Sequence, residues 1–203
     1  MAVPGRLIDE DDVDDGGVED GILAEQEEEE DHATDPAIKA LASAATHGDV
    51  DALRLALDNL NGSINEPVED GDTLLHLSCL YGKFPCVQLL IERGADIEVK
   101  DEDGAIPLHD ACAGGYYNIV ELLLNSATSP DQKKRVLDTA DYEGDTPLHH
   151  AARGDHDNVV RLLLDNGACP TTKNAYDKIP YNLTEPPSPA CAVFEEFELR
   201  AVQ

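Results

Sequence analysis

The chain has 203 residues, with 43 Asp and Glu residues against 14 Lys and Arg residues and a formal net charge of −29 at pH 7. A field of this sign repels nucleic acids and anionic membranes and attracts basic proteins, so neither a nucleic-acid nor a membrane partner is expected. The length is sufficient for one domain with a tail, and no segment approaches the ~18 consecutive apolar residues that a membrane-spanning helix requires.

Residues 1–34 form an acidic segment that lacks the apolar content of a folded domain. Fifteen carboxylates lie between Asp9 and Asp35, with only scattered Val, Ile and Leu residues among them. Because so few apolar side chains cannot offset the entropy lost on ordering, we expect a disordered tail. A purely solvating role is the simplest interpretation. The alternative is an interaction tail that binds a basic partner or covers the scaffold in its place.

The folded part, 35–203, is expected to begin with a helix pair over 35–68. Residues 34–36 (Thr-Asp-Pro) are typical of a helix start, and Gly48 is placed to end that helix. Asp49 can then cap a second helix, because a short polar side chain accepts a hydrogen bond from a free backbone N–H there.

Three versions of one motif follow, over 69–100, 101–140 and 141–173. Each has a Gly in a tight turn, a segment related to Thr-Pro-Leu-His, a short helix of small residues and a helix ending in three aliphatic residues. The turn glycines are Gly71, Gly104 and Gly144, so the period is 33 residues and then 40. A period in this range indicates a stacked array of supersecondary units.

The seven additional residues of the longer spacing lie within 126–137, after the second helix of the third repeat. Lys133, Lys134 and Arg135 are adjacent in this insertion. A solvated loop or a lengthened helix end is the first interpretation. An acceptor for the acidic tail, or a determinant of specificity, is the alternative, because loops that interrupt a regular scaffold often carry function.

The last two copies depart from the motif. In the fourth repeat Gly154 comes one position early, so Asp155 is expected in the left-handed backbone region where Gly is usual. The fifth copy, 174–203, is interrupted at 186–189 (Pro-Pro-Ser-Pro), which cannot continue a helix. Residues 190–201 are expected to form a closing helix with inward side chains at Val193, Phe194 and Phe197.

The pattern Thr-Pro-Leu-His-x-Ala, complete at 146–151 and repeated at about 33 residues, resembles the ankyrin-repeat family. The resemblance implies an all-α ankyrin-repeat solenoid of about five helix-turn-helix repeats, caps included, joined by β-hairpin-like loops. It also implies a protein-binding scaffold without catalysis, whose hairpin tips and inner helices form a concave surface. By position, the candidate protein-binding residues are Glu69, Asp70, Asp72, Leu80, Tyr81, Glu102, Asp103, Tyr142, Glu143, Asp145, Arg153, Tyr176 and Lys178.

Carboxylates and tyrosines dominate this candidate surface. Tyrosine supplies flat amphipathic contact area of the kind enriched at binding hot spots. An acidic groove with tyrosines is therefore expected to select a Lys/Arg-rich segment. The alternative is that the carboxylates only keep the hairpin tips soluble.

A metal site and an enzyme active site are both disfavoured. His76-x-x-Cys79 and His109-x-x-Cys112 share one spacing, but neighbouring repeats lie ~10 Å apart, too far for four ligands at zinc bonds of ~2.0–2.3 Å. The resemblance implies instead that each histidine hydrogen-bonds a neighbouring loop and each cysteine fills a small buried position. No nucleophile, phosphate-loop or zinc-protease motif is present. We expect no enzyme activity, no catalytic residue, no metal and no cofactor.

The odd number of cysteines, five, and the lack of an apolar leader indicate reduced thiols in a cytoplasmic or nuclear protein. A monomer is expected. The leading hypothesis is an adaptor that binds a basic protein, in its sharper form a chaperone that shields a basic client until assembly. The alternative is a regulatory subunit that positions an enzyme or a transcription factor, with the acidic tail as an intramolecular gate.

Overall fold

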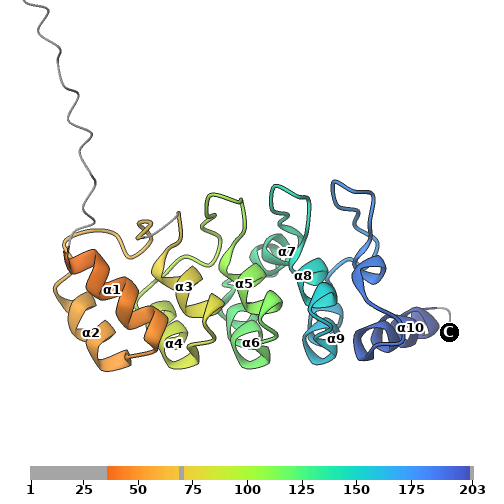
Figure 1. Cartoon of the computed structure of the whole chain (residues 1–203), viewed down its shortest axis with the longest axis horizontal. Helices are drawn as coiled ribbons and strands as arrows, with labels where there is room; N and C mark the ends of the chain where they lie inside the picture. The colour runs from red at the N-terminus through yellow and green to blue at the C-terminus, as the bar shows by residue number, and fades with distance from the viewer. Residues whose placement is uncertain (1–35, 69–70, 202–203) are drawn as a thin grey trace, which may run out of the picture. The chain divides into compact units, whose positions relative to one another are not determined.

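The computed structural model describes residues 36–68 and 71–201, which lie in one compact unit. Within these ranges the structure contains helices and no β-strand, and the helices stand in pairs side by side with hairpin-shaped loops along one edge (Figure 1). The predicted tail, 1–34, and the hairpin residues Glu69 and Asp70 lie outside the described ranges. The elements are α1 Pro36–His47, α2 Val50–Asp58, α3 Leu74–Leu80, α4 Phe84–Glu92, α5 Pro107–Ala113, α6 Tyr117–Ser126, α7 Pro130–Asp138, α8 Pro147–Arg153, α9 Asp157–Asp165, the 3₁₀ helix η1 Pro180–Leu183, and α10 Pro189–Ala201.

The first helix pair forms as its capping residues predict. Gly48 follows α1 with a φ of 82°, which places it in the left-handed region that ends a helix at least cost. The Asp49 side chain accepts a hydrogen bond from Ala52 N at 2.9 Å and caps α2. The two helices then bury Leu41 and Leu53 against each other and the second repeat.

The inner helices α3, α5 and α8 have only seven residues each, too few to be stable alone. A histidine in each first turn fixes the helix start. In α3 the ring Nδ1 of His76 lies 3.0 Å from Thr73 Oγ1, and in α8 the ring Nδ1 of His149 lies 2.9 Å from Thr146 Oγ1. The third repeat has Ile106 in place of threonine, and the Nδ1 atom of its histidine accepts from the Ile106 backbone N–H at 3.0 Å.

Leucines and valines of the outer helices α4, α6 and α9 form one continuous core with the inner helices. Leu90, Leu123 and Leu163, at equivalent positions of three successive repeats, are at most 2 % exposed. Burial of a leucine side chain contributes about 1.5–3 kcal/mol relative to exposure. Because the core runs through every described repeat, each repeat depends on its neighbours for burial of its apolar face.

The insertion of the third repeat forms a separate helix, α7, and the expectation of a loop or a lengthened helix end was wrong. Ser129 Oγ accepts from Gln132 N at 3.1 Å, so the Ser-Pro pair begins a new helix, and Val136 and Leu137 are buried. The Arg135 guanidinium donates to both carboxylate oxygens of Glu98, at 2.7 and 2.9 Å. The basic run of the insertion is therefore partly neutralised by the scaffold itself.

The predicted helix after the Pro-rich break forms as α10, which packs against α9. Asp155 has a φ of 54°, which confirms its placement in the left-handed region. Its Oδ1 atom also accepts from Ala190 N at 3.0 Å, so the unusual turn residue holds the start of α10. Val193 and Phe194 are buried, and Phe197 is half-buried. None of the helices in the described ranges is long and apolar enough to cross a membrane.

Candidate functional site

The hairpins of the third, fourth and fifth repeats are each held closed by one polar side chain at their first position. In the third repeat, Asp101 Oδ1 accepts from the backbone N–H groups of Asp103 and Ala105, at 2.9 and 2.8 Å. Asp141 and Asn174 form the equivalent bonds in the next two hairpins. The turn therefore requires an acceptor here, and this structural need accounts for part of the acidic composition.

Neighbouring hairpins are joined to one another through their backbones. Tyr142 N donates to Asp103 O at 2.9 Å, and Ala175 N donates to Glu143 O at 2.8 Å. Gly104 has a φ of 76°, and a Cβ atom there would lie 2.8 Å from the Tyr142 ring. Glycine is required at that point, and its absence of a side chain lets the Tyr142 ring lie over the third hairpin while it stays 77 % exposed.

The motif histidines also link the repeats, as the family resemblance implies. Their Nδ1 atoms accept from backbone N–H groups, so the Nε2 atoms carry the proton and donate. The acceptors are carbonyls of the next hairpin, at 3.3 Å for His76, 3.2 Å for His109 and 3.1 Å for His149. Burial lowers the pKa of all three rings, that of His109 to about 4. They remain neutral donors at physiological pH.

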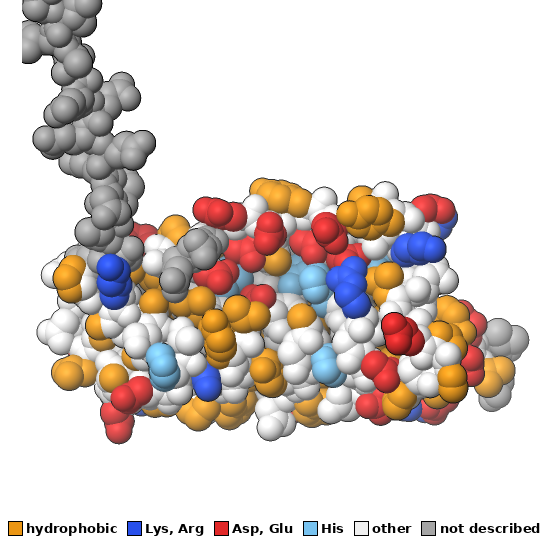
Figure 2. Space-filling model, in the orientation of Figure 1, with side chains coloured by type: hydrophobic (Ala, Val, Ile, Leu, Met, Phe, Trp, Pro, Cys, Tyr) orange, Lys and Arg blue, Asp and Glu red, His pale blue; other side chains and the backbone are white. Residues whose placement is uncertain are grey.

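An acidic hollow of about 310 Å³ lies between the third and fourth hairpins, above the inner helices α5 and α8. Figure 2 shows carboxylate groups gathered on this side of the molecule, with hydrophobic side chains on the rim above and on the surface below. The acidic hollow is lined by Asp101, Asp103, Ala105, His109, Asp110, Ala113, Asp141, Tyr142, Glu143 and His150. Five of these ten side chains are carboxylates and none is lysine or arginine.

Asp110 of α5 is the least satisfied group of the acidic hollow. Its Oδ2 atom is buried and has no hydrogen-bond partner among the described residues. Burial, together with the nearby carboxylates of Asp72 and Asp101, raises the pKa of Asp110 to about 8. Sequence reasoning missed this residue, although its position directly after the motif histidine places it beside the hairpins.

The prediction that Asp145 lies at an exposed hairpin tip was wrong. Its side chain is fully buried, where it is paired with Arg153 and accepts from Asn174 Nδ2 at 2.7 Å. Burial opposes ionisation, but these hydrogen bonds and the Arg153 charge outweigh it, so the pKa of Asp145 lies below its usual value. Both residues thus have a structural role inside the fourth repeat.

One group of side chains in the described ranges has the spacing of a metal site. The ligand atoms of Asp141, Asp145 and His150 lie within 4.8 Å of one another. His150 Nε2 is already 2.8 Å from Asp141 Oδ2, and Arg153 compensates the charge of Asp145. These contacts account for the cluster as a brace between the fourth hairpin and α8.

The remaining predicted residues are spread over several parts of the surface. Glu102, Asp103, Tyr142 and Glu143 lie exposed on the third and fourth hairpins, beside the acidic hollow or in it. Leu80 and Tyr81, at the end of α3, are 43 % and 49 % exposed. Tyr176 and Lys178 are exposed on the fifth hairpin, and Asp72 is half-buried on the second.

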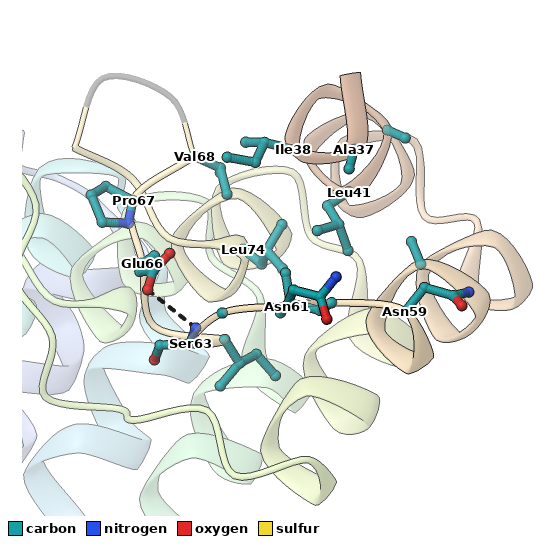
Figure 3. Close-up of a pocket in the computed structure, with 15 residues that line it drawn as sticks. Ala37, Ile38, Leu41, Asn59, Asn61, Ser63, Glu66, Pro67, Val68 and Leu74 are labelled. Carbon is teal, nitrogen blue, oxygen red and sulfur yellow. Dashed lines mark hydrogen bonds between the residues drawn. The ribbon is translucent and has the colours of Figure 1, made fainter. Parts of the chain in front are cut away.

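A second hollow, of about 250 Å³, lies in the first repeat and has a different character (Figure 3). The loop after α2 lines one side of this hollow and α1 lines another, and a hydrogen bond from Ser63 N to Glu66 Oε1 at 3.2 Å braces the loop. The lining of this second hollow is mostly apolar and includes Ile38, Leu41 and Leu74. Within this lining Glu66 is the one charged side chain, so it offers no comparable attraction for a cation.

Comparison with known proteins identifies the family. No curated protein matches the chain. A family model described as ankyrin repeats, in three copies, matches residues 22–101, 41–134 and 98–174, which together span most of the sequence. Ankyrin repeats are general protein–protein interaction modules, and proteins built from them are typically non-catalytic scaffolds. The chain belongs to the ankyrin-repeat family.

Proposed function

We propose that this protein is a non-catalytic adaptor that binds a basic protein, or a Lys/Arg-rich segment of one, through the hairpins and inner helices of its third and fourth repeats. The tyrosines Tyr142 and Tyr176, 77 % and 63 % exposed, supply amphipathic contact area along the same edge. The cytoplasm or the nucleus is the proposed location, and a monomer the proposed state.

The proposal rests on where acidic side chains lie without a lysine or an arginine beside them. Elsewhere in the described ranges, carboxylates such as Asp58, Glu98 and Glu196 form ion pairs with arginines. In the acidic hollow none of the five acidic side chains is paired with a lysine or an arginine of the described residues. Asp110, with a pKa of about 8, is mostly protonated near pH 7, so the negative charge of the hollow comes from the other four, of which Asp141 is bonded to His150. An acidic concavity of this kind attracts cationic groups and raises their association rate.

The test is binding of a fluorescent peptide of Lys and Arg spaced by Gly and Ser, followed by anisotropy. Affinity should fall steeply between about 0.1 M and about 1 M salt, where the screening length shortens from about 10 Å to about 3 Å. The double variant Asp103→Asn/Glu143→Gln should weaken binding. Asp165→Asn/Glu198→Gln, the same change of charge at exposed positions outside the acidic hollow, should have little effect.

Two results would overturn the proposal. One is the absence of salt-sensitive binding to the basic peptide, with an equal response to a peptide in which Glu replaces Lys and Arg. The other is an equal loss of affinity in both double variants, because net charge and not the acidic hollow would then be responsible. Salt-resistant binding of a partner that is lost with Tyr142→Ala would favour the regulatory subunit.

A further inference from the structure

Equivalent positions of successive repeats lie side by side, because α3, α5 and α8 pack against one another in a row (Figure 1). The position directly after the motif histidine is occupied by Leu77, Asp110 and His150. Leu77 is buried and apolar, and His150 is bonded to Asp141 at 2.8 Å. Of these three side chains, only Asp110 has a buried polar atom that lacks a partner.

An unpaired buried carboxylate oxygen is unfavourable, and folded proteins contain few of them. Asp110 belongs to the lining of the acidic hollow, whose other members are four carboxylates, two histidines, two alanines and the exposed Tyr142. At about 310 Å³ the space is at the low end of the roughly 300–1,000 Å³ of small-ligand pockets, a size for one side chain. A lysine or arginine side chain would satisfy the carboxylate and place its aliphatic stem or cation against the tyrosine ring.

An apolar patch lies on the second repeat, one repeat before the inner helix α5 that lines the acidic hollow. It consists of Leu80, Tyr81 and Phe84, which are 43 %, 49 % and 37 % exposed at the junction of α3 and α4. Leu80 occupies the same repeat position as Ala113, which lines the acidic hollow on the next inner helix. The residues of this patch are three of the seven large exposed hydrophobic residues of the described ranges, and a contiguous apolar patch is typical of an interaction site.

We propose that the partner segment is amphipathic as well as basic: one Lys or Arg side chain enters the acidic hollow at Asp110, and a large apolar side chain of the same segment covers the Leu80–Tyr81–Phe84 patch. This inference rests on the proposed function and adds the partner's sequence pattern. Neighbouring inner helices are ~10 Å apart, and an extended peptide advances ~3.3 Å per residue. The apolar residue is therefore expected about three positions from the basic one.

The experiment compares two fluorescent peptides of identical Lys/Arg content with the full chain and its variants. One peptide has Leu three positions from a central Lys, and the other has Ser there. The Leu peptide should bind at least about fivefold more tightly, the effect of one hot-spot contact. The double variant Leu80→Ala/Tyr81→Ala should abolish this difference. Leu55→Ala/Leu199→Ala, which removes exposed side chains elsewhere, should preserve it.

Asp110→Asn tests the placement of the basic side chain. It should weaken the Leu peptide by about tenfold or more, and should have no further effect once the central Lys is replaced by Gln. Because the substitution removes a carboxylate that burial disfavours, the melting temperature should stay equal or rise, which separates loss of binding from loss of folding.

Failure of the inference is distinguishable from failure of the proposed function. If neither peptide binds, the proposed function is wrong. If both peptides bind equally tightly, or if the effects of Asp110→Asn and the peptide Lys→Gln change are additive, the protein binds basic segments but not in this arrangement.

Discussion

Replacement of Arg153 by Ala is expected to destabilise the fold much more than replacement of Arg161, an arginine with similar exposure. Arg153 is 46 % exposed, but the carboxylate that it pairs with, Asp145, is fully buried. Arg161 is 43 % exposed and pairs with Glu196, which is 45 % exposed. The two arginines differ in the burial of their partners, so comparison of their alanine variants isolates that difference.

The magnitude follows from what remains around the buried carboxylate. A hydrogen bond to a charged group contributes about 1.5–3 kcal/mol, and removal of one partner of a fully buried ion pair costs about 3–5 kcal/mol. Asn174 still donates to Asp145 at 2.7 Å in the variant, so the lower range applies. We expect Arg153→Ala to lower the free energy of unfolding by about 1.5–3 kcal/mol, or the melting temperature by roughly 3–12 °C.

Urea unfolding followed by circular dichroism at pH 7 measures both variants. Because its partners lower the pKa of Asp145, their stabilisation is present above the unfolded-state pKa and is lost as the pH falls through the folded-state pKa. The cost of Arg153→Ala should therefore shrink as the pH falls below about 4. If Arg153→Ala costs no more than Arg161→Ala at pH 7, the buried carboxylate does not depend on its arginine and the reasoning fails.

Three further predictions concern the core, the C-terminal turn and acid sensitivity. Leu163→Ala should cost about 2–5 kcal/mol in urea unfolding, and a cost as small as that of exposed Leu55→Ala would contradict its core position. Asp155→Gly should reduce hydrogen-exchange protection in α10, despite the better turn residue, because the bond to Ala190 is lost; unchanged protection would contradict this. Burial lowers the pKa of His109 to about 4, so the unfolded chain binds a proton between pH 6.5 and 4 that the folded chain does not. The stability that the neutral His109 ring contributes is lost as the pH falls through this range. His109→Gln should therefore flatten the dependence of the free energy of unfolding on pH, and an unchanged slope would refute the assignment.

The sequence was sufficient to predict the repeat architecture because each signal is local. Gly48 and Asp49 determine where helices end and begin, and the structure confirms both. The motif histidines bond to neighbouring hairpins, as the family resemblance implies. The insertion was misjudged although Ser129-Pro130 carries a usual helix-start signal. Its basic run is typical of a solvated loop, whereas Val136 and Leu137 bury α7 in the shared core, and two apolar residues are too few to give a helical pattern.

The site was predicted less completely, because side-chain direction at the hairpins depends on neighbouring repeats. Asp145 occupies the same repeat position as the half-buried Asp72 but turns inward, since Arg153 and Asn174 are there to receive it. Asp110 was overlooked for a similar reason. The Asp110 Oδ2 atom has no hydrogen-bond partner because the equivalent residues of the adjacent repeats are Leu77, which is apolar, and His150, which is bonded to Asp141. The motif of a single repeat does not reveal this.

The helix α7 makes the third repeat unsuitable for exchange with another module. Gln132 donates to Glu98 of the second repeat at 2.9 Å, and Lys133 donates to Asn166 of the fourth at 3.2 Å. Ankyrin-type units are commonly shuffled, deleted or replaced by consensus copies because each is fitted only to its own interfaces. In this protein a consensus unit in third place would lack α7 and leave Glu98 and Asn166 without these partners. Attempts to redesign the array should therefore keep the second, third and fourth repeats as one block.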